Sequence, residues 1–168
     1  PDMSVEGWQI RLLPEMGLDL PRLSRLPKLL PHLVLPEYEQ SVWVDANFEI
    51  CGDLGELAQR VLRQHYLVFF KHPENRSSIY EEAIACVERQ KESPERIAAQ
   101  MEHYAAEGLP AFSIPACGVI FRRHHHCPLK IAMEAWWRQY CQFTCRDQLS
   151  FAYISWKYGL SYDVIEQN

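Results

Sequence analysis

Asp45 and Asn47 are the two residues of this sequence whose types and spacing most clearly suggest chemistry. They follow Ser41-Val-Trp-Val44, a short apolar run of β-branched and aromatic residues that favours a buried strand. A carboxylate and an amide oxygen at the end of a buried strand are hard donors for a divalent cation, and open α/β sheets bind ligands at strand ends. On these residues alone, an Asx turn in which Asp45 bonds its own backbone is the commoner arrangement.

Polar residues also follow two further predicted strands. His72 comes after the apolar run 66–70, and Arg122 with the histidines at 124–126 comes after the run 117–121. Polar groups gathered at strand ends are how α/β sheets build sites. The histidine run is a weak zinc signal, because alternate strand residues face opposite ways and no His-Glu-x-x-His spacing supports it. A histidine-held metal hydrolase therefore stays only an alternative.

Basic residues precede the strand that carries Asp45. Arg22, Arg25 and Lys28 recur every third position in the segment 21–35, whose helical pattern of leucines is interrupted by prolines. The spacing places the three on one side of that segment. It indicates either a solvated face or a cluster that awaits an anion.

Asp147 begins the last predicted helix, directly after Arg146. Most of this helix is apolar, so we expect it to be buried. A carboxylate at a helix N-terminus is stabilised by free N–H groups and by the dipole, which makes Asp147 a candidate helix cap.

The elements that must position these residues alternate between strands and helices. We expect helices near 54–62, 79–87, 94–107, 128–140 and 147–156, strands at 41–45, 66–70 and 117–121, and a short strand at 8–13. Asp53, Ser78 and Ser93 are predicted N-caps. Such alternation predicts an α/β layered domain.

Composition narrows the class of function. The 168 residues suffice for one domain, 48% are hydrophobic, 23% are charged, and the net charge is −5 with scattered basic residues. Nucleic acid is therefore not an expected partner, and no apolar run is long enough for a membrane span. The six cysteines form no C-x-x-C pair, which favours reduced thiols, and with no visible signal peptide we expect a cytoplasmic protein. Because the chain starts at Pro1, we expect a fragment of a longer protein.

Several familiar chemistries lack their motifs. The sequence contains no Gly-x-Ser-x-Gly elbow, no Gly-x-Gly-x-x-Gly and no Walker loop. Serine hydrolases, Rossmann cofactors and P-loop chemistry are unsupported.

Five motifs, in this order and spacing, resemble one family over about residues 8–159. They are Lys28-Leu-Leu-Pro-His32, Ser41-Val-Trp-Val-Asp-Ala-Asn47, Lys71-His-Pro73, Ile79-Tyr-Glu-Glu82 and Arg146-Asp-Gln-Leu-Ser-Phe151. The sequence resembles the glycosyltransferase-like domain, formerly of unknown function, that occurs in bacterial polysaccharide-synthesis and plant cell-wall proteins. The resemblance implies a single domain over residues 1–168.

The resemblance implies a GT-A-like, Rossmann-like mixed sheet flanked by helices, in which a strand-end Asp-x-Asp holds a cation on a donor diphosphate. Asp45 and Asn47 would then hold Mn²⁺ or Mg²⁺, and Asn47 departs from the motif by removing one negative charge. Nothing ahead of Trp8 matches the N-terminal nucleotide-binding strand of such domains, so part of the donor site can be missing.

The resemblance also implies roles for other residues. Arg25, Lys28 and His72 would lie on the donor-phosphate side, Arg146, Gln148 and Arg122 on the acceptor side, and Asp147 would be catalytic. The expected function is a metal-dependent glycosyltransferase that moves a sugar from a nucleotide-diphosphate donor to a glycan or other acceptor. The alternative is a non-catalytic carbohydrate-binding or scaffold relative, which the change at Asn47 and the missing strand would also fit.

Overall fold

The computed structural model describes residues 6–13 and 15–166. Eleven elements follow one another in this part of the chain: α1 (Leu20–Leu29), α2 (Pro31–Val34), β1 (Ser41–Val44), α3 (Leu54–Val61), β2 (Leu67–Phe70), α4 (Ile79–Glu88), α5 (Pro94–Ala106), β3 (Ala116–Arg122), α6 (Cys127–Gln142), α7 (Asp147–Lys157) and β4 (Asp163–Ile165). The predicted alternation of strands and helices is confirmed.

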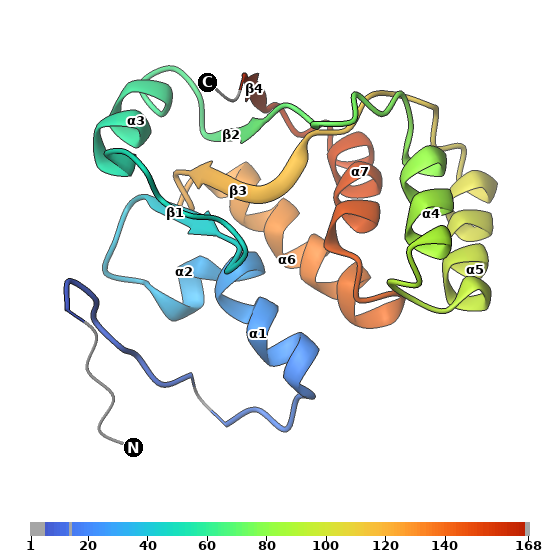
Figure 1. Ribbon diagram of the computed structural model, residues 1–168, viewed down its shortest axis with the longest axis horizontal. Helices are drawn as coiled ribbons and strands as arrows, with labels where there is room; N and C mark the ends of the chain where they lie inside the picture. Colours follow the sequence, from blue (N-terminus) through green and yellow to red (C-terminus); the bar gives the residue numbers. More distant parts are fainter. Residues whose placement is uncertain (1–5, 14, 167–168) are drawn as a thin grey trace.

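Four strands form one mixed sheet in the order β1-β3-β2-β4 (Figure 1). β3 lies in the middle and runs antiparallel to both β1 and β2, whereas β2 and β4 are parallel. Ser41 pairs with Arg122 and Val44 with Val119, so the C-terminal end of β1 meets the N-terminal half of β3. The C-terminal ends of β1 and β2 therefore lie at the same end of the sheet, and the C-terminal end of β3 lies at the opposite end.

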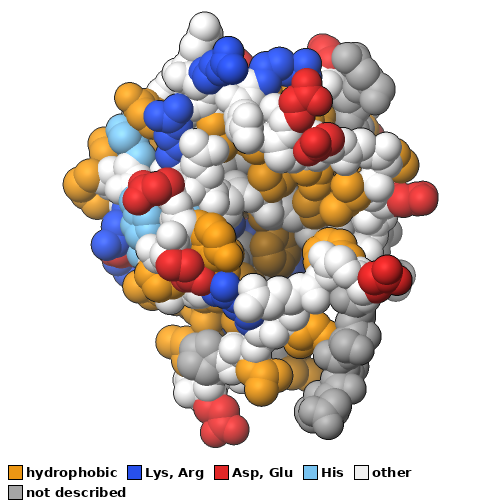
Figure 2. Space-filling view, turned by 90° about the vertical axis from the view of Figure 1, so that its left-hand side faces the viewer, with side chains coloured by type: hydrophobic (Ala, Val, Ile, Leu, Met, Phe, Trp, Pro, Cys, Tyr) orange, Lys and Arg blue, Asp and Glu red, His pale blue; other side chains and the backbone are white. Residues whose placement is uncertain are grey.

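The two faces of the sheet are covered unequally. One face carries the main core, which includes Phe69, Ile120, Trp136 and Phe151. On this side α7 contacts β3 and α6, whereas α4 lies against α7 and α5 lies against α4, further from the sheet (Figure 1). The other face carries a small cluster around Val68 and Phe121 and is covered by α3. Apolar side chains gather around a hollow on the side of the molecule that carries α3 and the edge strand β1 (Figure 2). Trp43 belongs to the main core face, which directs that side of β1 toward the large helical layer.

Local signals explain where most helices begin. Asp53 accepts from the amides of Gly55 and Glu56 and so caps α3, while Ser78 and Ser93 cap α4 and α5 in the same way. These are the capping residues predicted from the sequence. Each satisfies backbone N–H groups that the first helical turn leaves unpaired.

Two strand predictions differ from the structure. Residues 8–13 form no strand, and only an isolated bridge at Trp8 is present. The three-residue strand β4 is not apparent in the sequence, because it is short and pairs with β2 from far along the chain. Within residues 6–13 and 15–166, no helix has the length and apolar character needed to cross a membrane.

Candidate active site around Lys28

Lys28 lies between two carboxylates from distant parts of the chain. Its Nζ is 2.5 Å from Asp147 Oδ2 and 3.3 Å from Asp45 Oδ1. The Lys28 side chain is 1% exposed, although lysine is almost never fully buried unless it is paired. This ammonium joins the end of β1, the C-terminal part of α1 and the start of α7 into one polar centre. The basic residues of α1 are therefore not simply a solvated face.

Further cations surround Asp147. Arg25 Nε lies 3.5 Å from Asp147 Oδ2. Burial acts to raise the pKa of Asp147, but Lys28, Arg25 and Arg146 outweigh burial, and the pKa is lowered below its usual 3.8. The carboxylate is therefore ionised at neutral pH. With Asp45, the centre holds three cations and two carboxylates, an excess of positive charge that favours an anionic ligand.

Asp45 is oriented by its own strand. Trp43, on the same face two residues earlier, donates from its indole Nε1 to Asp45 Oδ1 at 2.8 Å. The backbone N–H of Asp45 donates to the Gly118 carbonyl at 2.8 Å and so extends the pairing of β1 with β3. Within the described part of the chain, the hydrogen-bond partner of Asp45 Oδ2 is Lys28 alone, at 3.5 Å. Because the side chain is 23% exposed, this oxygen remains available to a ligand.

Phe48 is a neighbour of this centre that the sequence did not single out. Its N–H donates to the Asp45 carbonyl at 3.0 Å, closing a turn whose central residues are Ala46 and Asn47. The Phe48 ring lies over Gly118, where an added Cβ would be 2.6 Å from Phe48 Cε2 and 3.6 Å from Asp45 Oδ2. The glycine in the middle of β3 was the signal that could have predicted this close approach.

A divalent cation fits this turn in donor chemistry. Asp45 Oδ2 and the exposed amide of Asn47 are hard oxygens on one turn, and Mg²⁺ usually takes only one or two protein ligands beside phosphates and water. Within the described ranges, no three His, Cys, Asp or Glu side chains gather as a metal cluster. A cation here would therefore need ligands from a bound phosphate.

His72 lies at the same end of the sheet as Asp45, but its side chain is bound by other groups. Its Nδ1 accepts from the Glu74 N–H at 3.1 Å, which places its proton on Nε2, 3.6 Å from Glu82 Oε2. Glu82 in turn pairs with Arg76 at 2.7 Å, and all three side chains are buried. Burial lowers the pKa of His72, so the ring is neutral at pH 7.

Arg122 and the histidines at 124–126 lie at the opposite end of the sheet from Asp45. Because β3 is antiparallel to β1, Arg122 pairs with Ser41 at the opposite end of the strand from Asp45. The rings of His124 and His125 lie 4.7 Å apart, but each has its own partner: His124 Nδ1 lies 3.1 Å from Ser41 Oγ, and His125 Nε2 lies 3.0 Å from the Pro36 carbonyl. His126 stacks on Tyr66 instead, so the three rings do not gather around one point.

Asp147 does not cap α7. The N-cap position is Arg146, which makes no side-chain capping bond, and the Asp147 carboxylate is paired with Lys28 instead. Arg146 Nε and Gln148 Nε2 are buried without a hydrogen-bond partner among the described residues. The start of α7 thus brings Asp147 into the centre and leaves unpaired donors on both sides of it.

Cys117 is buried beside this centre, and burial raises the pKa of its thiol well above 9.0. Such a thiol stays protonated, which excludes it as a nucleophile at neutral pH. None of the six cysteines is in a disulfide.

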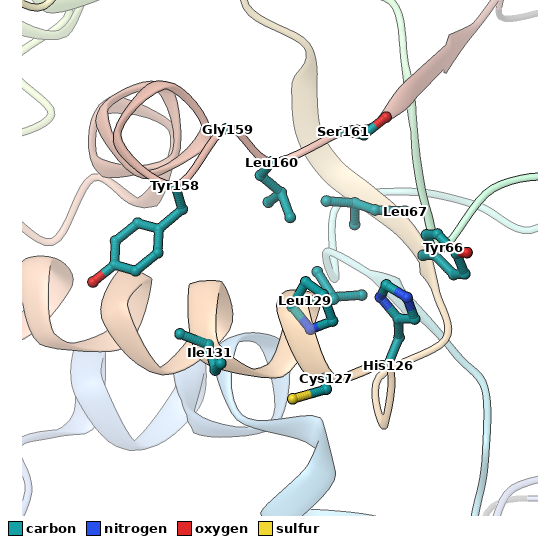
Figure 3. Close-up of a pocket in the computed structure, with 11 residues that line it drawn as sticks. Tyr66, Leu67, His126, Cys127, Leu129, Ile131, Tyr158, Gly159, Leu160 and Ser161 are labelled. Atoms are coloured by element: carbon teal, nitrogen blue, oxygen red, sulfur yellow. The ribbon is translucent and has the colours of Figure 1, made fainter.

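A separate apolar cavity lies at the other end of β2, where the strand begins. Its volume is about 380 Å³, and its lining includes Tyr66, His126, Leu129, Tyr158 and Leu160 (Figure 3). Among the residues that the structure describes, no lysine, arginine, aspartate or glutamate lines it. A diphosphate needs cationic partners, so the chemistry of the Lys28 centre suits it and that of this cavity does not.

The sequence matches the family model described as TOD1/MUCI70, glycosyltransferase-like domain, over residues 2–165. The chain belongs to this family. The resemblance seen in the motifs is thereby confirmed. Among relatives, the chain is 27% identical over 142 residues to a protein of Arabidopsis thaliana named probable hexosyltransferase MUCI70.

That match covers 79% of this chain and 24% of the Arabidopsis protein, so the chain spans about a quarter of that relative's length. No solved structure matches the chain. Family membership and the named relative support a glycosyltransferase type of function. The predicted α/β architecture is confirmed, as a four-stranded mixed sheet flanked by helices (Figure 1).

Proposed function

We propose that the chain is the catalytic part of a metal-dependent glycosyltransferase of GT-A-like arrangement, which takes a sugar from a nucleotide-diphosphate donor. The observation that carries the proposal is the buried Lys28 ammonium between Asp45 and Asp147, within a centre that has an excess of positive charge. A leaving diphosphate accumulates negative charge as the glycosidic bond breaks, and fixed cations stabilise it. The acceptor is a glycan or another hydroxyl compound.

The donor diphosphate is proposed to lie against Arg25 and Lys28. Arg25 is 32% exposed at its side chain, so it can reach a ligand while staying near Asp147. Asp45 and Asn47 would hold Mn²⁺ or Mg²⁺, which neutralises phosphate charge when it is bound. The Phe48 ring beside Asp45 Oδ2 is 39% exposed and offers an apolar surface to the donor at the same turn.

Asp147 is proposed to orient the acceptor hydroxyl. Its pKa lies below the usual value, so the carboxylate is a hydrogen-bond acceptor at neutral pH but a weak general base. Gln148 and Arg146 have unpaired buried nitrogens next to it and are proposed to contact the acceptor. Orientation of the nucleophile by such groups contributes to rate by holding the reacting atoms in place.

A second candidate is a non-catalytic carbohydrate-binding relative. It is favoured by one observation: the Lys28 ammonium already pairs with both carboxylates, and Asn47 supplies no charge to a cation. Such a protein would bind sugars without nucleotide and without metal.

A thermal-shift panel of nucleotide sugars, with and without Mn²⁺, separates the two functions. A ligand that binds only the native state raises the melting temperature by mass action. If the chain is a transferase, nucleotide sugars should raise the melting temperature, and Mn²⁺ should enlarge this rise. The effect of Mn²⁺ should be lost in Asp45→Ala and kept in Asn47→Asp. Shifts with free sugars alone, or a Mn²⁺ effect that is unchanged in Asp45→Ala, would contradict the proposal.

A further inference from the structure

We propose that Arg122 is a positioning residue for this site, because it holds the backbone at Lys28 and so sets where the Lys28 ammonium lies between Asp45 and Asp147. The inference rests on the proposed function, in which that ammonium faces the donor phosphates. It assigns to Arg122 a role behind the site rather than in contact with the acceptor.

The sequence leaves two adjacent carbonyls without helical partners. Pro31 has no N–H, so the carbonyl of Pro27, four residues earlier, cannot receive its usual bond. α1 ends at Leu29 and α2 starts at Pro31, and within the described part of the chain no backbone amide reaches the Lys28 carbonyl. Both carbonyls lie at the negative end of the α1 dipole.

Arg122 satisfies both carbonyls from the neighbouring layer. Its Nη2 donates to the Pro27 carbonyl at 3.2 Å, and its Nη1 donates to the Lys28 carbonyl. The residue is 1% exposed, and burial lowers its pKa to about 9, which still leaves the guanidinium charged at pH 7. A rigid fork of N–H donors can hold two carbonyls at once, which an ammonium cannot do with the same geometry.

The same side chain ties α1 to β1. Arg122 Nε donates to Ser41 Oγ at 2.9 Å, and Ser41 is the first residue of the strand that ends before Asp45. Arg122 therefore links the two elements that bring Lys28 and Asp45 together. A small displacement of α1 along β1 would move the ammonium away from both carboxylates.

A measurement without ligand tests the positioning directly. In a chain labelled with ¹⁵N-lysine, the buried and doubly paired Lys28 ammonium should give a slowly exchanging NMR signal that is assigned by its loss in Lys28→Met. We expect Arg122→Met to speed the exchange of this signal at least tenfold. Phe121→Leu is the matched control, because Phe121 is also fully buried in β3 but faces the α3 side. Phe121→Leu should leave the exchange rate of the Lys28 signal unchanged.

A double-mutant cycle tests the functional consequence, with inorganic pyrophosphate and Mn²⁺ as the probe in calorimetry. Arg122→Met should weaken binding about tenfold in the natural background, as loss of a supporting residue commonly does, and should have no further effect in a Lys28→Met background. Arg122→Lys keeps the positive charge but lacks the paired N–H donors of the guanidinium, so it should also weaken pyrophosphate binding, to a smaller degree. This variant replaces Arg122→Met in both experiments if Arg122→Met does not fold.

The outcomes of the two proposals are distinguishable. An unchanged Lys28 signal in both Arg122 variants, or losses of binding that add in the double variant, would overturn the role of Arg122. Unchanged pyrophosphate binding in Lys28→Met would overturn the proposed function, while the NMR comparison would still decide the positioning.

Discussion

The Lys28 ammonium and the Asp147 carboxylate are 2.5 Å apart although the two residues belong to opposite halves of the chain. Both side chains are largely withdrawn from water, at 1% and 11% exposure. A buried pair of this kind is costly to break, because the remaining charge has no partner. The pair therefore serves as a structural link as well as part of the proposed active site.

Lys28→Met should destabilise the fold by about 3–5 kcal/mol, since it removes the buried ammonium that lies between Asp45 and Asp147. Urea unfolding measures this change. The matched control is Lys71→Met, which removes an exposed pair with Glu166 and should cost less than about 1 kcal/mol. Equal losses in the two variants would show that the Lys28 pairs contribute no more than surface contacts.

The stability of the fold should fall between about pH 7 and pH 5. Burial lowers the pKa of three histidines, His32, His72 and His124. Below the unfolded value of about 6.5, the unfolded chain takes up protons that the folded chain refuses, so acid favours unfolding. His72→Gln should flatten this dependence in urea titrations at several pH values, whereas His65→Gln at a half-exposed site should not. A stability that is constant over this range would contradict the assignment.

Gly118→Ala should displace the Phe48 ring, because the new Cβ would be 2.6 Å from Phe48 Cε2. The ring is partly exposed and can rotate away, so we expect a stability cost below about 1 kcal/mol. Donor affinity should fall to the level of Phe48→Ala, and the double variant should bind no worse than Phe48→Ala alone. Normal affinity in Gly118→Ala, measured by calorimetry, would show that Phe48 has no part in binding.

Much of this architecture follows from local signals, but the site depends on pairings that cross the whole chain. The caps at Asp53, Ser78 and Ser93 act within a few residues, so their helices could be predicted. The burial of Lys28 could not, because basic residues at every third position also describe a solvated helix face. The indole bond from Trp43 to Asp45 was accessible in principle, since residues two apart in a strand share a face.

The direction of β3 was the second feature that the sequence could not predict. The polar residues after 117–121 follow the end of a strand, as Asp45 and His72 do, and so suggested a shared site. Because β3 runs antiparallel to β1 and β2, Arg122 lies at the opposite end of the sheet from Asp45 and His72. Strand direction depends on non-local pairing and leaves no mark in a single strand's own pattern. The role of Arg122 emerges only when the freed carbonyls of α1 are seen beside it.

Asp147→Asn should lower sugar transfer by about 10²-fold or more while donor affinity stays within about twofold, since the neutral amide keeps the shape but loses the charge that orients the acceptor. Steady-state kinetics and donor titration measure the two effects separately. A purely structural role predicts near-normal turnover, and that result would remove Asp147 from the catalytic account.

The central claim is that the cations of α1 bind a donor diphosphate, and Arg25→Gln tests it most directly because Arg25 is partly exposed and its loss should leave the fold intact. Calorimetry with Mn²⁺ should compare the nucleoside diphosphate that gives the largest thermal shift with its parent nucleoside. The account predicts that Arg25→Gln weakens diphosphate binding about tenfold and nucleoside binding less than about twofold, because only the phosphates carry charge. Equal losses for the two ligands, or no loss for the diphosphate, would contradict it.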